Sequence, residues 1–375
     1  MLDLARELLP LVRAGTSVAA VTVTHVARSA PRGVGAAMAV TADATVIGSI
    51  SGGCVESDAV ALALSSIADG RARTAQFGFT DADAHAAGLA CGGHVEVIAH
   101  VVDAREPLVL EALTNAAADR PATLAVVATG PHAGRSVPVA ALRASAPPSE
   151  RGLLDDAVAT HDSRMLRSAY DGADVLVLAH APRARLIILG AGEHAAALCR
   201  VGAASGFAVT VCDPWETLVT AERFPAADRL AVCAPAEFLA SIDPAEVDAR
   251  TTICVLTHDE RLDVPAIRQA LSMPVGFVGA MGARLTVARR AALLHEAGVS
   301  DVDLARLHSP LGLDLSGSSP DEAALSVLAE IVASRHGGSG RPLRETTGRL
   351  HRNDVPVPAH ATAAAGCALP EQARP

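Results

Sequence analysis

The chain has very few aromatic residues. Phe, Trp and Tyr make up 2% of its 375 residues, with one Trp and one Tyr. Aromatic platforms on which single-stranded nucleic acid could stack its bases are therefore nearly absent. The formal charge of −10 also disfavours a phosphate backbone as a partner. The composition thus predicts no nucleic-acid partner and a core built from Ala, Val, Leu and Ile.

Long apolar runs and paired cysteines are missing as well. No run reaches the length of a membrane span, and the first residues carry acidic side chains where a signal peptide has basic ones. The seven cysteines are odd in number and lack paired spacing, which argues against a disulfide framework. We therefore expect a cytoplasmic protein without membrane attachment.

The first half of the chain alternates β-branched runs with segments of helical spacing. The pattern predicts helices at 2–13, 56–67 and 107–118, and strands at 18–26, 38–40, 45–50, 95–102, 123–128 and 175–178. Residues 130–151 are rich in Pro, Ser, Ala and Gly and are interpreted as a surface excursion. The sequence therefore predicts an N-terminal α/β domain over residues 1–182.

From residue 183 the pattern becomes a regular alternation of strands and helices. Residues 186–189 form a continuous apolar run, which is typical of a parallel strand covered on both faces. Further strands are predicted at 208–212, 230–233, 252–256 and 275–278, with a last helix at 321–334. The fold class is therefore α/β in two domains, the second a Rossmann-like, doubly wound parallel sheet over 183–336. Residues 337–375 are expected to form a largely flexible tail.

A dinucleotide-type fingerprint follows the first strand of the second domain. Gly190 permits a tight turn, Gly192 lets a pyrophosphate approach the main chain, and Ala195 allows close packing of the helix. Asp213 ends the next strand and is a candidate acceptor for ribose hydroxyls. Glu193, however, places a carboxylate near the phosphate position. NAD(P) or another nucleotide is thus a candidate ligand, and a Rossmann scaffold that has lost its nucleotide remains the alternative.

A second glycine-rich segment follows the strand predicted at 275–278. Residues 279–284 would then lie at the carboxyl edge of the sheet, where doubly wound folds bind ligands. Gly279 and Arg284 are candidate cofactor-binding residues there, and Arg289 and Arg290 could hold anions. The alternative is a surface helix with ordinary charges.

Two short phrases in the first domain nearly repeat each other. Residues 51–56 read Ser-Gly-Gly-Cys-Val-Glu, and residues 91–97 read Cys-Gly-Gly-His-Val-Glu-Val. Glycine pairs persist where positive φ or a close approach to the main chain is needed. A cysteine can attack as a thiolate, carry sulfur or bind a soft metal. If the two phrases face each other, they form a thiol-bearing, backbone-lined pocket, which we expect in the cleft between the two domains.

The phrases supply the candidate site residues. These are Cys54 and Cys91 for sulfur chemistry, Glu56 for positioning or proton transfer, and, for backbone contacts with a cofactor, Gly52, Gly53, Gly92 and Gly93. Two alternatives stay open: both cysteines could be small buried apolar residues, or Cys91 and His94 could begin a zinc site. Because no second Cys or His pair completes a zinc set, no metal site is predicted.

These segments together resemble the XdhC/CoxI family of maturation factors for molybdenum hydroxylases such as xanthine dehydrogenase and carbon monoxide dehydrogenase. The resemblance covers nearly the whole chain to about residue 351, and the Gly-Gly-Cys-Val-Glu phrase is its most specific part. One departure is Glu193-His194, because many relatives place His directly after Gly. The segments that carry the resemblance are 30–35, 48–56, 91–97, 186–192, 211–214, 277–284, 310–315 and 343–345.

The resemblance implies an accessory protein that binds the molybdenum cofactor, assists its sulfuration and inserts it into an apo molybdenum hydroxylase. Cys54 and Cys91 would then contact sulfur or molybdenum. A cysteine desulfurase is a candidate further partner, and a homodimer is the commonest default for oligomeric state. The chain is expected to be a cofactor-maturation chaperone rather than a stand-alone enzyme. The main alternative is an NAD(P)-dependent oxidoreductase with Cys54 as a redox thiol, and a third is a binding scaffold without chemistry.

Overall fold

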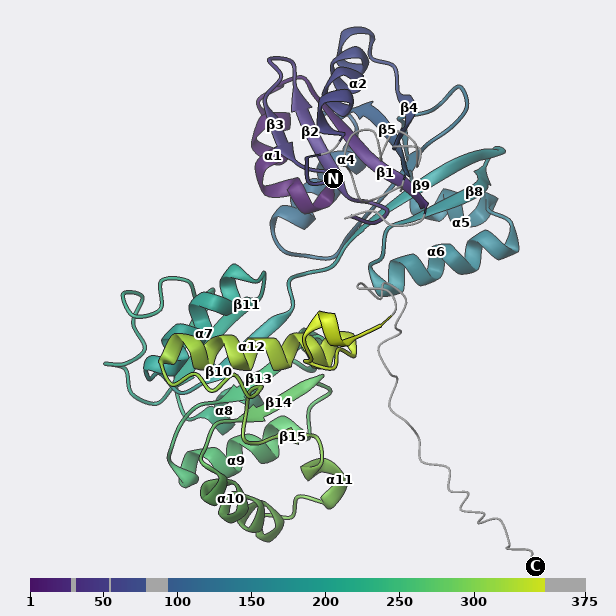
Figure 1. Cartoon of the computed structure of the whole chain (residues 1–375). Coiled ribbons are helices and arrows are strands. Elements are labelled where there is room, and N and C mark those ends of the chain that lie inside the picture. The colour runs from purple at the N-terminus through teal and green to yellow at the C-terminus, as the bar shows by residue number, and fades with distance from the viewer. Residues whose placement is uncertain (28–31, 54, 79–93, 348–375) are drawn as a thin grey trace, which may run out of the picture. The chain divides into compact units, whose positions relative to one another are not determined.

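The computed structural model describes residues 1–27, 32–53, 55–78 and 94–347. The chain divides into two compact units, Met1–Pro182 (unit 1) and Arg183–Pro375 (unit 2) (Figure 1). The predicted cleft between domains stays a prediction, and each unit is considered by itself below. The tail expected over 337–375 lies mostly outside the described residues and stays a prediction too.

Unit 1 contains two antiparallel sheets. The first has the strand order β3-β2-β1-β5-β4 and consists of β1 (Val18–Ala27), β2 (Ala37–Thr41), β3 (Val46–Gly48), β4 (Arg73–Gly78) and β5 (His94–Val101). The second has the order β7-β6-β9-β8 and consists of β6 (Ala122–Val127), β7 (Ser136–Val137), β8 (Arg164–Tyr170) and β9 (Ala173–His180). The strand pair predicted around Asp43 is confirmed as β2 and β3.

Helices pack against both faces of both sheets. After a short 3-10 turn, η1 (Leu2–Leu4), helix α1 (Ala5–Arg13) shares a core with α4 (Pro107–Ala117) and with one face of each sheet. The opposite face of the first sheet is covered by α2 (Glu56–Asp69). The opposite face of the second is covered by α5 (Val139–Ser145) and α6 (Pro148–Thr160). Burial of both faces explains why the first seven residues of β1, mostly apolar, are all buried although its neighbours are antiparallel.

The segment 130–151, interpreted from its composition as a surface excursion, instead contributes regular elements that pack on the second sheet. It contains β7, α5 and the first turn of α6. Pro138 is the N-cap of α5, and Pro148 is the first residue of α6. Proline is tolerated at the start of a helix because its missing N–H would have no intrahelical partner there. The prolines that suggested a loop therefore mark two helix starts.

A buried histidine makes unit 1 sensitive to acid. His100 on β5 is 4% exposed, and its Nδ1 has no hydrogen-bond partner among the described residues. Burial, together with the nearby positive amino group of Met1, lowers the pKa of His100 to about 4 from 6.5. Because the unfolded chain binds the proton first, stability is lost as pH falls from 6.5 towards 4.

Replacing His100 with leucine is expected to weaken the pH dependence of the free energy of unfolding. For the natural chain the free energy of unfolding should fall by about 2 kcal/mol from this group between pH 7 and pH 5. In H100L this contribution disappears because leucine does not titrate. Urea unfolding of both proteins at the two pH values measures it. An identical pH dependence in the two chains would show that His100 does not carry the effect.

Unit 2 is a doubly wound parallel sheet. Its order is β12-β11-β10-β13-β14-β15, and each neighbouring pair is parallel. The strands are β10 (Arg185–Leu189), β11 (Ala208–Asp213), β12 (Arg229–Val232), β13 (Thr252–Val255), β14 (Phe277–Ala280) and β15 (Leu307–His308). The predicted Rossmann-like architecture is confirmed.

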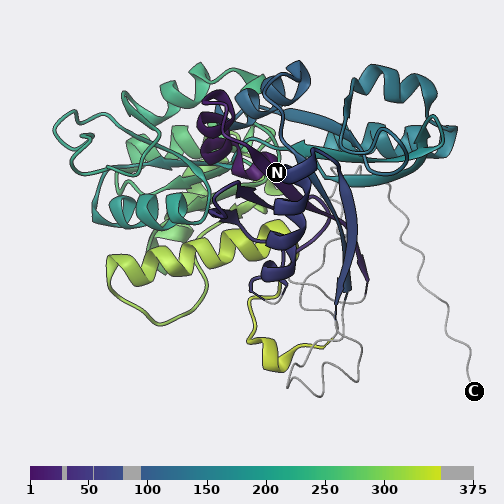
Figure 2. The ribbon, with the colours of Figure 1, turned by 90° about the horizontal axis from the view of Figure 1, so that it is seen from above.

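Helices cover both faces of this sheet. One face packs against α7 (Glu193–Ala204) and α12 (Pro320–His336), and Figure 2 shows α12 as the long yellow-green helix of the unit. The other face packs against α8 (Pro235–Ser241), α9 (Glu260–Leu271) and α10 (Arg284–Glu296). The remaining short helices are α11 (Asp301–Leu304), η2 (Pro244–Glu246) and η3 (Leu343–Glu345).

Candidate functional site

The loop between β3 and α2 wraps around one carboxylate. The side chain of Glu56, the first residue of α2, accepts hydrogen bonds from the hydroxyls of Ser49 and Ser51, both at 2.6 Å. It also accepts bonds of 2.9–3.1 Å from four backbone N–H groups, those of Ser51, Gly52, Gly53 and Val55. Residues 49–53 and Val55, here called the Glu56 loop, therefore surround the Glu56 carboxylate with hydrogen-bond donors.

Glycine is required in this loop for its backbone angles. Gly52 has φ +84° and Gly53 has φ +124°, values that side chains with a Cβ rarely adopt. A Cβ at either position would meet no described atom within 4 Å. Conformation rather than crowding therefore selects glycine here, since positive φ turns both N–H groups towards Glu56.

The charge of Glu56 is fixed by the same hydrogen bonds. Partial burial acts to raise its pKa, but the bonds from Ser49, Ser51 and the backbone outweigh burial and lower the pKa to about 2. The carboxylate is thus ionised at neutral pH and fully engaged by donors. This geometry supports a positioning role for Glu56 rather than the proton transfer that was the other expectation.

Four other predicted site residues lie outside the described residues. These are Cys54, Cys91, Gly92 and Gly93. The residues that flank position 54, Gly53 and Val55, both donate to Glu56. Val55 and Val95, the valines of the two phrases, pack into one hydrophobic cluster on the α2 face of the first sheet. The chain segments adjoining both phrases therefore share a core, and the facing of the two thiols stays a prediction.

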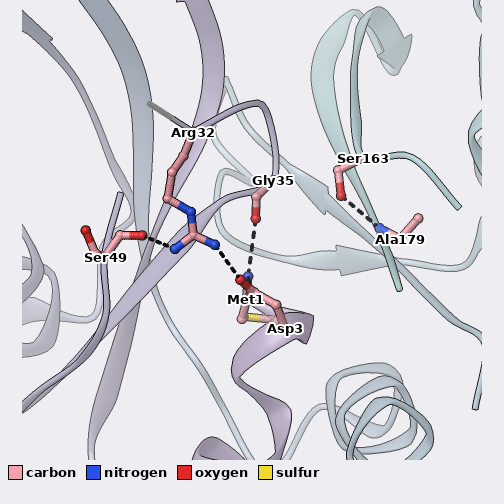
Figure 3. A network of polar contacts seen from close by, with 7 residues as sticks. All are labelled: Met1, Asp3, Arg32, Gly35, Ser49, Ser163 and Ala179. Atoms are coloured by element: carbon pink, nitrogen blue, oxygen red, sulfur yellow. Dashed lines mark hydrogen bonds and ion pairs between the residues drawn. The ribbon is translucent and has the colours of Figure 1, made fainter. Parts of the chain in front are cut away.

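An arginine connects the Glu56 loop to a pocket. Arg32 donates from Nη1 to the Ser49 carbonyl oxygen at 2.6 Å and from Nη2 to Asp3 at 3.1 Å (Figure 3). Asp3 also pairs with the amino group of Met1 at 2.9 Å. The Arg32 guanidinium thus has two protein partners, the Ser49 carbonyl oxygen and the Asp3 carboxylate.

The pocket beside Arg32 has a volume of about 350 Å³. Gly33 and Gly35 line it together with Ser163 and His180. Gly35 has φ +88°, and a Cβ there would lie 2.3 Å from the Cβ of Ser163. Arg32 donates hydrogen bonds to Asp3 in the pocket wall and to Ser49 in the Glu56 loop. These bonds link the pocket to the loop.

In unit 2 the side chain of Asp213 accepts hydrogen bonds that fix the fingerprint turn. The Gly190 backbone has φ +116°, and a Cβ there would lie 2.9 Å from the Thr257 nitrogen. One Asp213 oxygen accepts from the Ala191 N–H at 3.0 Å and the other from the Trp215 N–H at 2.9 Å. Asp213 is only 6% exposed, so it braces this turn instead of presenting a free carboxylate to a ribose.

The start of α7 is open but carries an acidic side chain. A Cβ at Gly192 would meet no described atom within 4 Å, and Ala195 is fully buried against the sheet. Glu193 is the first helical residue, and Arg223 pairs with it at 3.3 Å. The turn therefore keeps the backbone access that a phosphate needs, with a carboxylate and its counter-ion beside it.

The segment after β14 differs from its prediction. Gly279 lies inside β14, and a Cβ there would be 2.4 Å from Leu311, so packing explains this glycine. Arg284 begins α10 and is exposed at the carboxyl edge, as expected. Arg289 pairs with Glu260 at 2.7 Å. Arg290, expected to hold anions at the surface, instead is 2% exposed and points into the unit.

Arg290 is the centre of a buried network that the sequence did not reveal. Its Nη2 donates to Asp263 at 3.1 Å and to the Met281 carbonyl at 2.8 Å, and its Nη1 donates to Ser309 at 3.1 Å. Asp263, also 2% exposed, accepts in addition from the Thr257 hydroxyl. The network thus ties together the segments that follow β13, β14 and β15.

Within the described ranges there is no cluster of three or more His, Cys, Asp or Glu side chains suited to a metal ion. The zinc alternative depends on Cys91, which those ranges omit. A search of the same ranges found no helix that is both long enough and apolar enough to span a membrane.

Comparisons with known proteins agree on one family. Residues 11–78 match the model of the XdhC and CoxI family, and residues 186–331 match that of the XdhC Rossmann domain. The chain is 26% identical over 321 residues to the molybdenum cofactor insertion chaperone PaoD of Escherichia coli, covering 86% of this chain and 84% of PaoD.

Two further relatives are longer than the region they share with this chain. YqeB of Escherichia coli, an uncharacterized protein, is 29% identical over 47% of this chain and 34% of its own length. A protein of Bacillus subtilis described as a probable xanthine dehydrogenase component is 30% identical over 41% of this chain and 44% of its own length. The chain therefore spans less than half of each of these two relatives.

The fold itself has a solved counterpart. A crystal structure described as a xanthine dehydrogenase from Bacillus halodurans superposes with a TM-score of 0.67 at 22% identity, covering 88% of this chain and 95% of that one. This likeness extends over both units, while the two family models match one segment in each. The chain belongs to the XdhC and CoxI family.

Proposed function

We propose that this chain binds the molybdenum cofactor as its cargo, assists its sulfuration and inserts it into an apo molybdenum hydroxylase. The observation that carries the proposal is the Glu56 loop, in which six hydrogen bonds to one carboxylate order the backbone on both sides of position 54. The role of the relative PaoD as a molybdenum cofactor insertion chaperone supports the same function.

The chemistry of the cargo suits this site. Molybdenum held by dithiolene sulfur favours soft ligands, and Cys54 and Cys91 are the residues proposed to supply thiolate contacts. Exchange of the oxo ligand, Mo=O + HS⁻ + H⁺ → Mo=S + H₂O, requires sulfide. A cysteine desulfurase is the partner proposed for the sulfur, and a thiol reductant, itself oxidised to a disulfide, would release its persulfide sulfur as sulfide. Ordering of the Glu56 loop before cargo binds would reduce the entropy that binding costs.

A transfer assay tests this function. The purified chain is loaded with molybdenum cofactor, freed of excess by gel filtration and mixed with an apo molybdenum hydroxylase. Enzyme activity should appear with the loaded natural chain and should fall at least tenfold with Cys54→Ser, because the thiolate contact is lost. Cys199→Ala, in α7 of unit 2, is the matched control and should transfer normally. Activation no better than that given by free cofactor would contradict the proposal.

Nucleotide binding at the fingerprint turn is the second candidate function. The open backbone at Gly192 favours it, while the inward-facing Asp213 disfavours a bound NAD(P) ribose. Trp215 is the single tryptophan of the chain and is 66% exposed two residues beyond Asp213. Quenching of its emission by NADPH, together with NADPH-dependent substrate turnover, would favour an oxidoreductase over the carrier.

A further inference from the structure

Two thiols meet at the ends of neighbouring strands in unit 2. Cys212 is the penultimate residue of β11, and Cys233 directly follows Val232, the last residue of β12. Their sulfur atoms are 3.9 Å apart, and the Cys212 thiol donates to the Cys233 carbonyl oxygen at 3.4 Å. The two side chains are thus in contact without being bonded.

The two thiols differ in their access to solvent. Cys212 is fully buried in the cluster that α8 and α9 form with the sheet, and Cys233 packs at the margin of that cluster, partly exposed. The other two described cysteines, Cys199 and Cys254, are fully buried in the cluster on the opposite face. A partly exposed thiol therefore has a buried thiol as its neighbour, an arrangement in which oxidation of the accessible thiol can be resolved by the buried one.

We propose that Cys212 and Cys233 form a reversible oxidation site whose substrate is a hydroperoxide. The Cys233 sulfur attacks the peroxide and breaks its O–O bond, giving a sulfenic acid and water. The Cys212 sulfur then attacks the Cys233 sulfur, and the displaced hydroxide takes the Cys212 proton as a second water. Two thiols lose two electrons to hydrogen peroxide, and a dithiol reductant reverses the reaction.

Geometry and acidity fit this order of events. The sulfurs must close from 3.9 Å to the roughly 2.05 Å of a disulfide, and the proposal assigns this movement to the partly exposed Cys233. Burial raises the pKa of the Cys212 thiol, with further contributions from Cys233 and Asp213. Cys212 is therefore the less reactive of the two towards peroxide and acts second.

The cysteine pair lies next to Asp213, the residue that fixes the fingerprint turn. Asp213 follows Cys212 and holds the Ala191 and Trp215 backbone amides. A bond formed at Cys212 pulls on this end of β11, so we expect oxidation to change the environment of the Trp215 indole. Neither Cys212 nor Cys233 is among the residues proposed to contact the cargo.

Peptide mapping of the full chain tests the proposal. Trypsin places Cys212 in peptide 201–223 and Cys233 in peptide 230–250. After hydrogen peroxide, the two peptides should appear as one disulfide-linked species that dithiothreitol separates, and Trp215 emission should shift reversibly. Peptides that stay unlinked after peroxide would contradict the proposed oxidation site. A linked species without any change in Trp215 emission would show that oxidation does not affect the fingerprint turn.

Single variants test the order of attack. In Cys212→Ser, peroxide with dimedone should label Cys233, whereas in Cys233→Ser position 212 should stay unlabelled. Cys199→Ala is the control and should still form the link. Far-UV circular dichroism confirms that each variant is folded. Labelling of Cys212 in Cys233→Ser at the rate seen for Cys233 would contradict the proposed sequence of events.

Discussion

Replacing Glu56 with glutamine is expected to lower molybdenum cofactor binding at least tenfold. The carboxylate accepts from two hydroxyls and four backbone N–H groups, and a glutamine amide would turn a donor towards some of these donors. Losing charge-assisted bonds at this partly exposed position should cost about 2 kcal/mol, enough for a tenfold loss. Cofactor retained after gel filtration measures the effect.

Asp58→Asn is the matched control for this prediction. Asp58 lies in the same first turn of α2 and is exposed, so its substitution removes the same charge without touching the loop. The control should bind cofactor like the natural chain. Equal retention by the Glu56→Gln and Asp58→Asn chains would show that the carboxylate does not organise the site.

Protonation of the same carboxylate is expected to destabilise the Glu56 loop at low pH. Its pKa in the folded chain is about 2, below the ordinary 4.5. The stabilisation from the ionised form is therefore complete above pH 4.5 and is lost as pH falls from there towards 2. This window overlaps that of His100 only between about pH 4.5 and 4, so His100 dominates the loss at higher pH and Glu56 the loss at lower pH.

Replacing Arg290 with methionine is expected to destabilise unit 2 by about 3 to 5 kcal/mol. Removing one partner of a buried ion pair leaves the other charge buried without compensation, here Asp263 at 2% exposure. The same substitution also removes the bonds to Met281 and Ser309, so the segments after β14 and β15 lose their link. Urea unfolding followed by circular dichroism measures the change.

The neighbouring arginine supplies the control. Arg289 pairs with Glu260 but is 72% exposed, so Arg289→Met should change the free energy of unfolding by no more than about 1 kcal/mol. A double variant, Asp263→Leu with Arg290→Met, should lose less than the sum of its single variants, because no unpaired charge remains. Equal losses for Arg289→Met and Arg290→Met would mean that the buried pair does not stabilise the unit.

The sequence predicted unit 2 well because its signals are local. The apolar run 186–189 and Gly190 define a strand and the turn after it, and the structure places both as expected. The inward orientation of Asp213 was not predictable, because it depends on two backbone amides, one of them 22 residues away. A side chain can occupy a fingerprint position and still face the protein.

The features that sequence analysis missed depend on backbone conformation or on distant pairs. The Val-Glu ending of the first phrase was visible, but its capture by the preceding loop requires positive φ at both Gly52 and Gly53. Arg290 looked like a surface charge because its partner Asp263 lies 27 residues earlier on α9. Antiparallel pairing in unit 1 was hidden because helices bury both faces of its sheets, giving runs that resemble parallel strands.

The most direct test of the proposed carrier is the molybdenum content of the chain itself. The natural protein, Cys54→Ser, Cys91→Ser and the double variant are purified from one cofactor-producing host, and molybdenum and pterin are measured per chain. The two-thiol site predicts substantial loading of the natural chain, a marked loss in each single variant and no greater loss when both are combined. Equal loading of all four proteins would contradict it.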